Sequence, residues 1–179
     1  AYDIGGRGDK SFNDAAAAGL ERAIGELNLV KENTRELSAA PNESEDAAAT
    51  RLRQLVADGF NPIIAVGFKY ATATQTVAAE SPQVNFAIVD DNTVDLPNVT
   101  PLVFAEEQGS FLVGAAAALK TTACKIGFVG GVETPLIQKF EAGYAAGAKA
   151  VAPNVEIDSD YLTPAGDFTG FNDPAKATE

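Results

Sequence analysis

Short runs of β-branched and apolar residues alternate with alanine-rich helical patterns along almost the whole chain, and this alternation constrains the fold more than any other feature. The runs expected to form strands are residues 1–4, 29–37, 62–67, 84–89, 100–104, 125–129 and 155–161. Strands that are each followed by a helix build βαβ units, in which neighbouring strands run parallel. The sequence therefore predicts an α/β fold with a mostly parallel sheet flanked by helices.

The first expected helix carries a recognisable start. Ser11 followed three residues later by Asp14 is typical of a capping box, and apolar residues then recur at helical spacing. Residues 43–59 predict a second helix with one apolar face. Residues 108–120 are apolar on every side, which predicts a helix that is buried on most of its surface.

The strand at residues 125–129 is expected to begin a second lobe. Residues 1–121 then form an N-terminal α/β lobe, and residues 122–179 form the beginning of a second one. The chain ends soon after Pro174, a residue favoured in the first turn of a helix, and an isolated helix that short is marginal in water. We therefore expect that the second lobe is incomplete and that the natural protein continues.

The charge balance argues against two classes of partner. Thirteen Lys and Arg residues stand against 25 Asp and Glu residues, which gives a net charge of −12. Such a chain is repelled by the phosphates of nucleic acids and by the anionic face of a membrane. The single cysteine, Cys124, lies among apolar residues and is expected to be a small buried side chain.

Residues that serve common catalytic mechanisms are scarce. The chain contains no His, so it can form neither a Ser-His-Asp triad nor a Cys-His metal site. It also lacks a D-x-D-x-D-G loop that would hold Ca²⁺. The sequence therefore predicts a binding protein, not an enzyme, with no catalytic residues, cofactor or metal.

The segment GGRGDKS, which follows the first expected strand, has three interpretations. A phosphate-binding loop requires Gly immediately before Lys-Ser, but Asp9 stands in that place and would repel a triphosphate. The RGD tripeptide of cell-adhesion ligands needs a mobile exposed loop, and three residues match easily by chance. We favour the third interpretation, in which a glycine-rich turn lies at the rim of a pocket for a neutral or weakly polar ligand.

Ligands of open parallel sheets bind beyond the carboxyl ends of the strands, where loops lead into helices. Four loops of this kind are expected, at residues 3–13, 67–69, 90–92 and 130–131. In the third loop, one of Asp90 and Asp91 is expected to stabilise a turn while the other faces the ligand. Adjacent residues of an extended chain point to opposite sides, so both are not expected to share one ligand.

The first loop offers three candidate ligand contacts, each with a structural alternative. Asp3 could accept hydrogen bonds from hydroxyl or N–H groups of a ligand, or it could only cap the glycine-rich turn. Phe12 could stack on a heteroaromatic ring, with the amide of Asn13 beside it, or it could pack in the core. The residues alone do not decide between these alternatives.

The segments YDIGGRGDKSFNDAAAAG, FNPIIAVGF, FAIVDD, FAEEQGSFLVGAAAAL, KIGFVGG, FEAGYAAGAKAV and GDFTGFNDPAK follow one another along essentially the whole chain. In this order they resemble the basic membrane lipoprotein family, and SFN and EEQGSFLVG are the more specific blocks. Members of that family are substrate-binding components of ABC importers for purine nucleosides. The resemblance implies a type I periplasmic-binding-protein fold, in which two α/β lobes close on one nucleoside.

The resemblance also implies a role for five residues. Asp3 matches an Asp that serves the ribose hydroxyls, and Asp90 matches an Asp that reads the purine edge. Phe12 and Asn13 of the SFN block stack on the base and hydrogen-bond to it. Phe171 of GFNDPAK matches a second aromatic residue, which comes from the other lobe. The implied ligand is inosine, guanosine or adenosine.

The resemblance implies a monomer that works outside the cytoplasm, delivers its ligand to an ABC permease, and is held at the plasma membrane by a lipid on a Cys upstream of Ala1. Two departures stand out: the chain is acidic, and it lacks a D-x-D-Q segment that family members carry further on. Two other classes of protein are alternatives to this family. One is a nucleoside hydrolase that gathers carboxylates around Ca²⁺, and the other is the sensor domain of a repressor, which needs a helix-turn-helix segment.

Overall fold

The computed structural model describes residues 1–40 and 43–178. The chain divides into two units, Ala1–Phe104 and Ala105–Glu179. The sequence prediction instead divided the two lobes after residue 121. The difference concerns α4 (Glu106–Lys120), which belongs to the second unit because it packs along α5 (Pro135–Val151).

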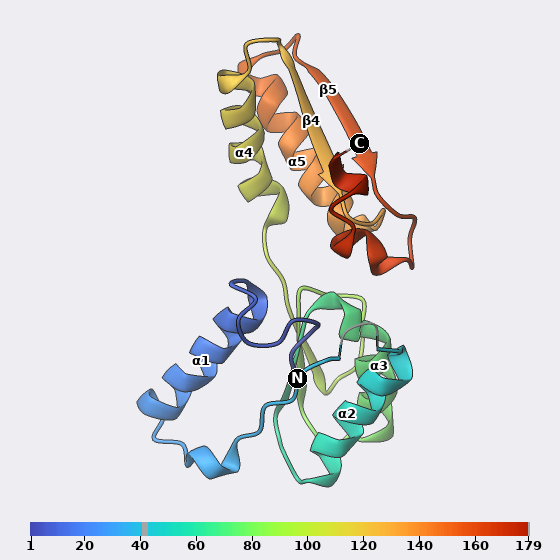
Figure 1. Cartoon of the computed structure of the whole chain (residues 1–179). Helices are drawn as coiled ribbons and strands as arrows, with labels where there is room; N and C mark the ends of the chain where they lie inside the picture. Colours follow the sequence, from blue (N-terminus) through green and yellow to red (C-terminus); the bar gives the residue numbers. More distant parts are fainter. Residues whose placement is uncertain (41–42, 179) are drawn as a thin grey trace. The chain divides into compact units, whose positions relative to one another are not determined.

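The first unit is an α/β layer structure. Its sheet contains three parallel strands in the order β1 (Ile63–Val66), β2 (Phe86–Val89) and β3 (Val99–Leu102). Its helices are α1 (Phe12–Glu26), α2 (Glu45–Ala57) and α3 (Ala71–Glu80). Helices α2 and α3 cover one face of the sheet, and α1 lies on the other face (Figure 1). The three strands confirm the prediction of a parallel sheet.

The face of the sheet beneath α2 and α3 holds the main core. Its buried members include Leu52, Val77 and Ile88, none of which is exposed to solvent. On the opposite face a smaller cluster joins Ala17 of α1 to Val66 of β1. Burial of each large apolar side chain contributes about 1.5–3 kcal/mol, so the α2–α3 face dominates the stability of this unit.

The start of the chain extends the sheet by backbone pairing without forming a regular strand. Ala1 accepts a hydrogen bond of 2.9 Å from the last residue of β1, and Tyr2 pairs in parallel with Ser38 on its other side. The strand predicted at residues 1–4 is reduced to this bridge. The strand predicted at residues 29–37 is wrong, because that segment contains a 3₁₀ helix at Lys31–Asn33 and reaches the sheet only at its end.

Helix α1 begins where predicted, but with a different cap. The hydroxyl of Ser11 makes no capping hydrogen bond. Instead the carboxylate of Asp9 accepts hydrogen bonds of 2.9–3.0 Å from the N–H groups of Ser11, Asn13 and Asp14. The carboxylate of Asp14 turns back and accepts from two N–H groups of the preceding loop, at 2.7 and 3.0 Å. Desolvation opposes ionisation of Asp9, but these N–H groups outweigh it and lower the pKa of Asp9.

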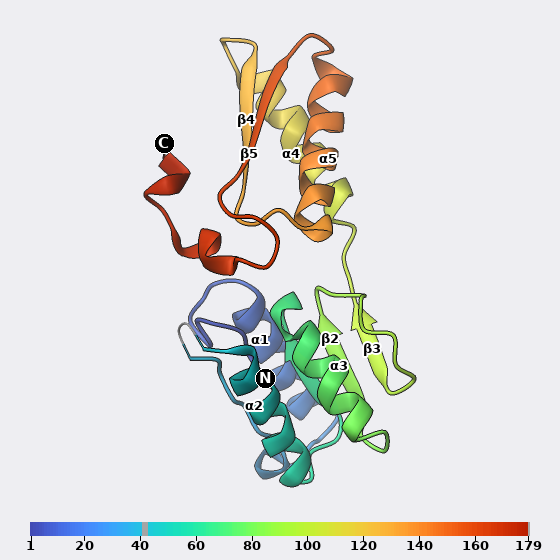
Figure 2. The same ribbon diagram turned by 90° about the vertical axis from the view of Figure 1, so that its right-hand side faces the viewer.

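The second unit contains a βαβ unit. Strands β4 (Lys125–Gly130) and β5 (Glu156–Tyr161) pair in parallel, and α5 connects them. Helices α4 and α5 lie side by side next to the strands (Figures 1 and 2). The prediction that α4 is buried on most sides is wrong. Leu112 and Leu119 are 71% and 73% exposed, because α5 and β4 cover one side of the helix.

Two further expectations concern the second unit: that Cys124 is buried and that a short helix starts near Pro174. Cys124, expected to be buried, is exposed at the turn before β4, with a φ of 55°. The C-terminal segment forms short 3₁₀ helices at Phe168–Asn172 and Lys176–Thr178. Among the described residues, no helix has both the length and the apolar character needed to cross a membrane.

Three glycines allow α4 and α5 to approach backbone to backbone. A β-carbon built on Gly114 would lie 1.9 Å from the carbonyl oxygen of Tyr144, and one on Gly147 would lie 1.8 Å from that of Phe111. A β-carbon on Gly143 would likewise lie 2.2 Å from a carbonyl oxygen of α4. Any larger residue at these positions must push the helices apart, since backbone atoms cannot rotate away as a flexible side chain can.

We expect Gly147→Ala to destabilise the second unit by about 1–3 kcal/mol, because the new methyl group collides with the backbone of α4. Gly109→Ala is the matched control, since a β-carbon there meets no atom within 4 Å and alanine favours a helix. Urea unfolding monitored by circular dichroism measures both. Equal stability of the two variants would contradict the close helix contact.

We expect Asp9→Ala to destabilise the first unit by about 1 kcal/mol at neutral pH, whereas Ser11→Ala has little effect. Because folding lowers the pKa of Asp9, its contribution is present above the unfolded value of about 3.9 and is lost as the pH falls through the lower folded value. Urea unfolding of both variants at pH 7 and pH 3 provides the measurement. A larger loss in Ser11→Ala would restore the capping-box interpretation.

Candidate functional site

The carboxyl ends of the parallel strands in the first unit meet at one edge of the sheet. Asp3 follows the extended start of the chain, Gly67 follows β1, and Asp90 follows β2. The N–H of Gly67 donates to the last residue of β2 at 3.2 Å, and the N–H of Asp90 donates to the last residue of β3 at 2.8 Å. This edge therefore gathers residues that are far apart in the sequence, and we call it the first-unit edge.

Asp3 uses one of its two carboxylate oxygens within the protein. Oδ1 accepts a hydrogen bond of 2.7 Å from the N–H of Ile4, whereas Oδ2 accepts none from the part of the chain that the structure describes. Burial raises the pKa of Asp3, although the Ile4 hydrogen bond and the charge of Lys69 oppose the shift. Asp3 therefore does cap the turn, as its structural alternative suggested, yet it keeps one oxygen for an external donor.

Gly67 makes room for that carboxylate. Its φ of 103° lies in the region that favours glycine, and a β-carbon there would lie 3.0 Å from Oδ2 of Asp3 and 3.2 Å from its Cβ. A larger residue would both strain the backbone and displace Asp3. The sequence pattern predicts a ligand-facing loop at residues 67–69 but does not reveal this steric role.

Phe12 is on the surface of the first unit, not in its core. Its side chain is 42% exposed, and its ring meets the ring of Phe104 edge to face, with 5.7 Å between centroids and 71° between planes. Phe104 is itself 53% exposed. Phe104 is not among the site residues predicted from the sequence. It comes two residues after β3, and this position past a strand end is the signal that could have identified it.

Asn13 is buried, with 1% of its surface exposed. Its Oδ1 accepts from the N–H of Asp3 at 3.1 Å, and its Nδ2 donates to the carbonyl of Asp3 at 3.3 Å. Its own N–H donates to Asp9 at 3.0 Å. The side-chain amide thus pairs with both backbone groups of Asp3, an arrangement that the sequence did not suggest.

Of the two adjacent aspartates, Asp91 stabilises a turn, and a ligand-facing role for Asp90 stays a prediction. The carboxylate of Asp91 accepts from both the N–H and the hydroxyl of Thr93 at 2.8 Å, which stabilises a turn. Asp90 is 8% exposed and adopts a φ of 70°. Aspartate enters this left-handed region more readily than most non-glycine residues.

Phe171 belongs to the second unit. It lies against the loop after β4, where a β-carbon on Gly131 would be 2.5 Å from its ring, and it is 45% exposed. The hydroxyl of Thr163 donates to the carbonyl of Gly131 at 2.9 Å, so Thr163 also contacts the loop after β4. The structure brings Asp3, Phe12, Asn13 and Asp90 together within one unit and places Phe171 at the strand end of the other.

The charged groups of GGRGDKS are used inside the first unit. The guanidinium of Arg7 pairs with Glu36 at 2.7 and 2.9 Å and with Glu21 at 2.6 Å, while Asp9 caps α1. Both charged side chains of the RGD tripeptide therefore have internal partners. The N–H groups that a phosphate would need at the helix start already bind the Asp9 carboxylate, which argues against the phosphate-loop interpretation.

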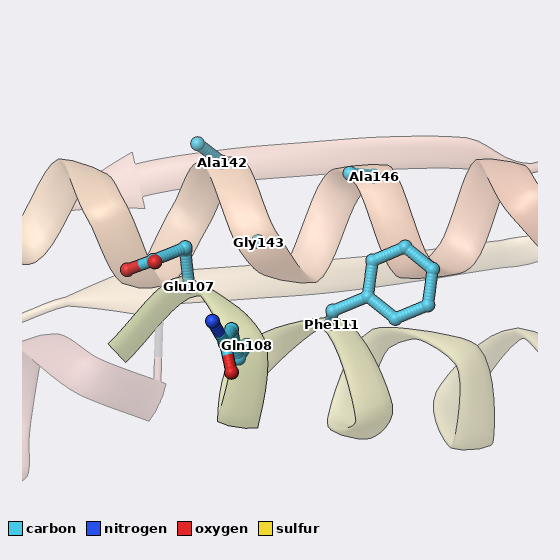
Figure 3. Close-up of a pocket in the computed structure, with 6 residues that line it drawn as sticks. All are labelled: Glu107, Gln108, Phe111, Ala142, Gly143 and Ala146. Carbon is cyan, nitrogen blue, oxygen red and sulfur yellow. The ribbon is translucent and has the colours of Figure 1, made fainter. Parts of the chain in front are cut away.

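A shallow hollow of about 450 Å³ lies along the pair α4 and α5 in the second unit. Its lining consists of Glu107, Gln108, Phe111, Ala142, Gly143 and Ala146. Figure 3 shows Phe111 beside the small residues of α5, with the two polar side chains toward one end. None of the predicted site residues lines this hollow. The residues described by the structure also contain no cluster of three His, Cys, Asp or Glu side chains that could hold a metal ion.

Comparisons with known proteins extend these observations. Residues 2–177 match the family described as ABC transporter substrate-binding protein PnrA-like. The chain is 40% identical to the CD4+ T-cell-stimulating antigen of Listeria monocytogenes, over 93% of this chain and 45% of the relative. It is 36% identical to the ABC transporter nucleoside-binding protein BmpA of Lactococcus lactis, over 93% of this chain and 46% of the relative. The chain thus spans about half the length of these relatives.

A solved structure shares the fold. The solute-binding protein of an ABC transporter system from Aeropyrum pernix K1 superposes with a TM-score of 0.74 at 30% identity, over 94% of this chain and 48% of that one. The family description and this structure describe solute binding, in agreement with the prediction of a binding protein and not an enzyme. The chain belongs to the PnrA-like family of ABC transporter substrate-binding proteins.

Proposed function

We propose that this chain supplies ligand-binding residues of a substrate-binding protein for an ABC importer, and that the ligand is a purine nucleoside. The observation that carries the proposal is the combination at the first-unit edge. There an exposed aromatic pair, Phe12 and Phe104, accompanies the carboxylates of Asp3 and Asp90. A relative named as nucleoside-binding supports the choice of ligand.

Each part of a nucleoside has a matching group in this proposal. The purine ring stacks on the exposed ring of Phe12. The role of Phe171, which lies in the second unit, stays a prediction of the family resemblance. Oδ2 of Asp3 accepts hydrogen bonds from the ribose hydroxyls, and Asp90 accepts from N–H groups on the purine edge. Stacking contributes about 1–3 kcal/mol per base, and a site built for a hydroxyl strongly rejects ligands that lack it.

The charge of the chain refines the ligand class. A net charge of −12, together with two carboxylates at the first-unit edge, disfavours a ligand that carries phosphate groups. We therefore propose inosine, guanosine or adenosine and not the corresponding nucleotides. The proposed partner is an ABC permease that receives the nucleoside from a monomeric protein outside the cytoplasm, held at the plasma membrane by a lipid anchor outside this sequence.

We propose that the protein binds the nucleoside without hydrolysing it. A Ca²⁺-dependent nucleoside hydrolase would need several carboxylates around the metal at the first strand, but the Asp9 carboxylate already binds three N–H groups. Incubation with inosine and Ca²⁺, followed by chromatography, separates the two functions. Release of hypoxanthine would favour the hydrolase, and intact inosine supports a binding protein.

Native mass spectrometry of the purified chain tests the ligand directly. A retained mass that matches a purine nucleoside supports the proposal and names the ligand. Isothermal titration with inosine, guanosine, adenosine and inosine monophosphate then ranks them, and the three nucleosides are expected to bind more tightly than the nucleotide. Absence of binding by every nucleoside would reject the proposed ligand class.

We expect Phe12→Ala to weaken inosine binding by about tenfold or more, because the base loses its stacking surface. Leu27→Ala, at the other end of α1, is the matched control, since Leu27 is 68% exposed and far along the helix from the first-unit edge. Calorimetry measures both variants. Equal affinity of Phe12→Ala and the unmodified chain would remove Phe12 from the site.

We expect Gly67→Ala to weaken inosine binding by about tenfold, because the new methyl group displaces the Asp3 carboxylate. Gly59→Ala separates this effect from backbone strain. Gly59 also has a positive φ, of 83°, but a β-carbon there meets no atom within 4 Å. Both variants are expected to lose stability, and only Gly67→Ala is expected to lose affinity. An equal loss of affinity in both would show that strain alone is responsible.

A further inference from the structure

We propose that Asn13 contributes to ligand binding by holding Asp3 in position, and not by contacting the ligand itself. This inference rests on the proposed function, because it concerns the same first-unit edge. It assigns Asn13 a role different from the base contact that the family resemblance implies. Three features of the structure lead to it: the pairing of the amide, its burial, and the fixed position of the Asp3 backbone.

The amide of Asn13 is already engaged on both sides. Oδ1 accepts from the N–H of Asp3 at 3.1 Å, and Nδ2 donates to the carbonyl of the same residue at 3.3 Å. This two-point pairing resembles the pairing of one strand with another, but a side chain provides it. A base that competed for these amide atoms would leave backbone groups of Asp3 unsatisfied, which costs about 1–3 kcal/mol for each buried group.

The position of Asn13 also argues against direct contact. The residue is 1% exposed, whereas its neighbour Phe12 is 42% exposed, so a ligand can reach the ring but not the amide. The N–H of Asn13 donates to Asp9 at 3.0 Å within the cap of α1. Rotation of Asn13 toward a ligand would have to break the contacts that hold the start of the helix.

The pairing completes a set of contacts that fix the peptide before and after Asp3. The carbonyl of Tyr2 accepts from the N–H of Ala39 at 2.9 Å and from the hydroxyl of Tyr70 at 3.1 Å. With the backbone of Asp3 paired to Asn13, its carboxylate can lie in the space left by Gly67. Without the Asn13 amide, the backbone of Asp3 loses both of its hydrogen bonds to that side chain. Phe12 and Asp90 are expected to stay in place.

The two roles predict different ligand selectivity. In the positioning role, Asn13→Ala weakens inosine about tenfold, because Asp3 serves the ribose, and leaves hypoxanthine within about twofold. In a base-contact role both ligands weaken alike, because they share the same purine edge. Calorimetry with the two ligands distinguishes these cases. Equal losses for inosine and hypoxanthine would overturn the inference, and Ser11→Ala is the control expected to change neither.

A double-mutant cycle isolates the dependence on Asp3. If Asn13 acts through Asp3, Asn13→Ala costs affinity for inosine in the unmodified chain but little in an Asp3→Ala background. A ligand contact by Asn13 itself would cost the same in both backgrounds and would contradict the proposal. If Asn13→Ala does not fold, Asn13→Ser gives the same comparison, because a hydroxyl is too short to pair with both backbone groups of Asp3.

A measurement without ligand separates this inference from the proposed function. Burial holds the pKa of Asp3 above its ordinary value, so release of Asp3 in Asn13→Ala should move that pKa back toward the ordinary value. Carboxyl ¹³C NMR titration measures it. An unchanged Asp3 titration would overturn the positioning role, even if nucleosides bind. Absence of nucleoside binding by the unmodified chain, together with a shifted titration, would reject the ligand and keep the Asn13–Asp3 coupling.

Discussion

Parallel pairing of the strands in the first unit decides which residues can act together. Because β1, β2 and β3 run in the same direction, the loops after them emerge at one edge, and the start of the chain joins them through its backbone contacts with β1. Asp3, Gly67 and Asp90 become neighbours for this reason alone. An antiparallel arrangement of the same segments would separate them by the length of the strands.

The charged side chains of the first loop have partners inside the protein, and this limits which groups can bind a ligand. Arg7 is paired with two glutamates and Asp9 with three N–H groups, so neither presents an unused charge at the loop. One oxygen of Asp3, which accepts no hydrogen bond from the described residues, and the exposed ring of Phe12 are left. A hydrogen-bond acceptor beside an aromatic surface suits a ligand with a flat ring and hydroxyl groups better than it suits an anion.

The second unit depends on a different constraint, the close contact of α4 with α5. Gly143 and Gly147, four residues apart on one face of α5, let the carbonyl groups of α4 touch the helix surface. The same contact places α4 in the second unit and leaves Leu112 and Leu119 exposed. The apolar residues on all sides of α4 therefore do not predict how much of the helix surface is buried.

The alternation of apolar runs with helical patterns determined the α/β class and five strands close to their observed positions, because local periodicity matches the geometry of each element. It also led to Asp3, Phe12 and the pair Asp90–Asp91, since they lie in loops that follow expected strands, and only the family resemblance chose Asp90 from that pair. Only the tertiary structure decided that Asp9 caps α1, that Gly67 makes room for Asp3, and that Asn13 pairs with the Asp3 backbone. Each of these contacts depends on the distance between a side chain and a backbone group. Folding sets that distance, and the spacing of residues along the sequence does not predict it.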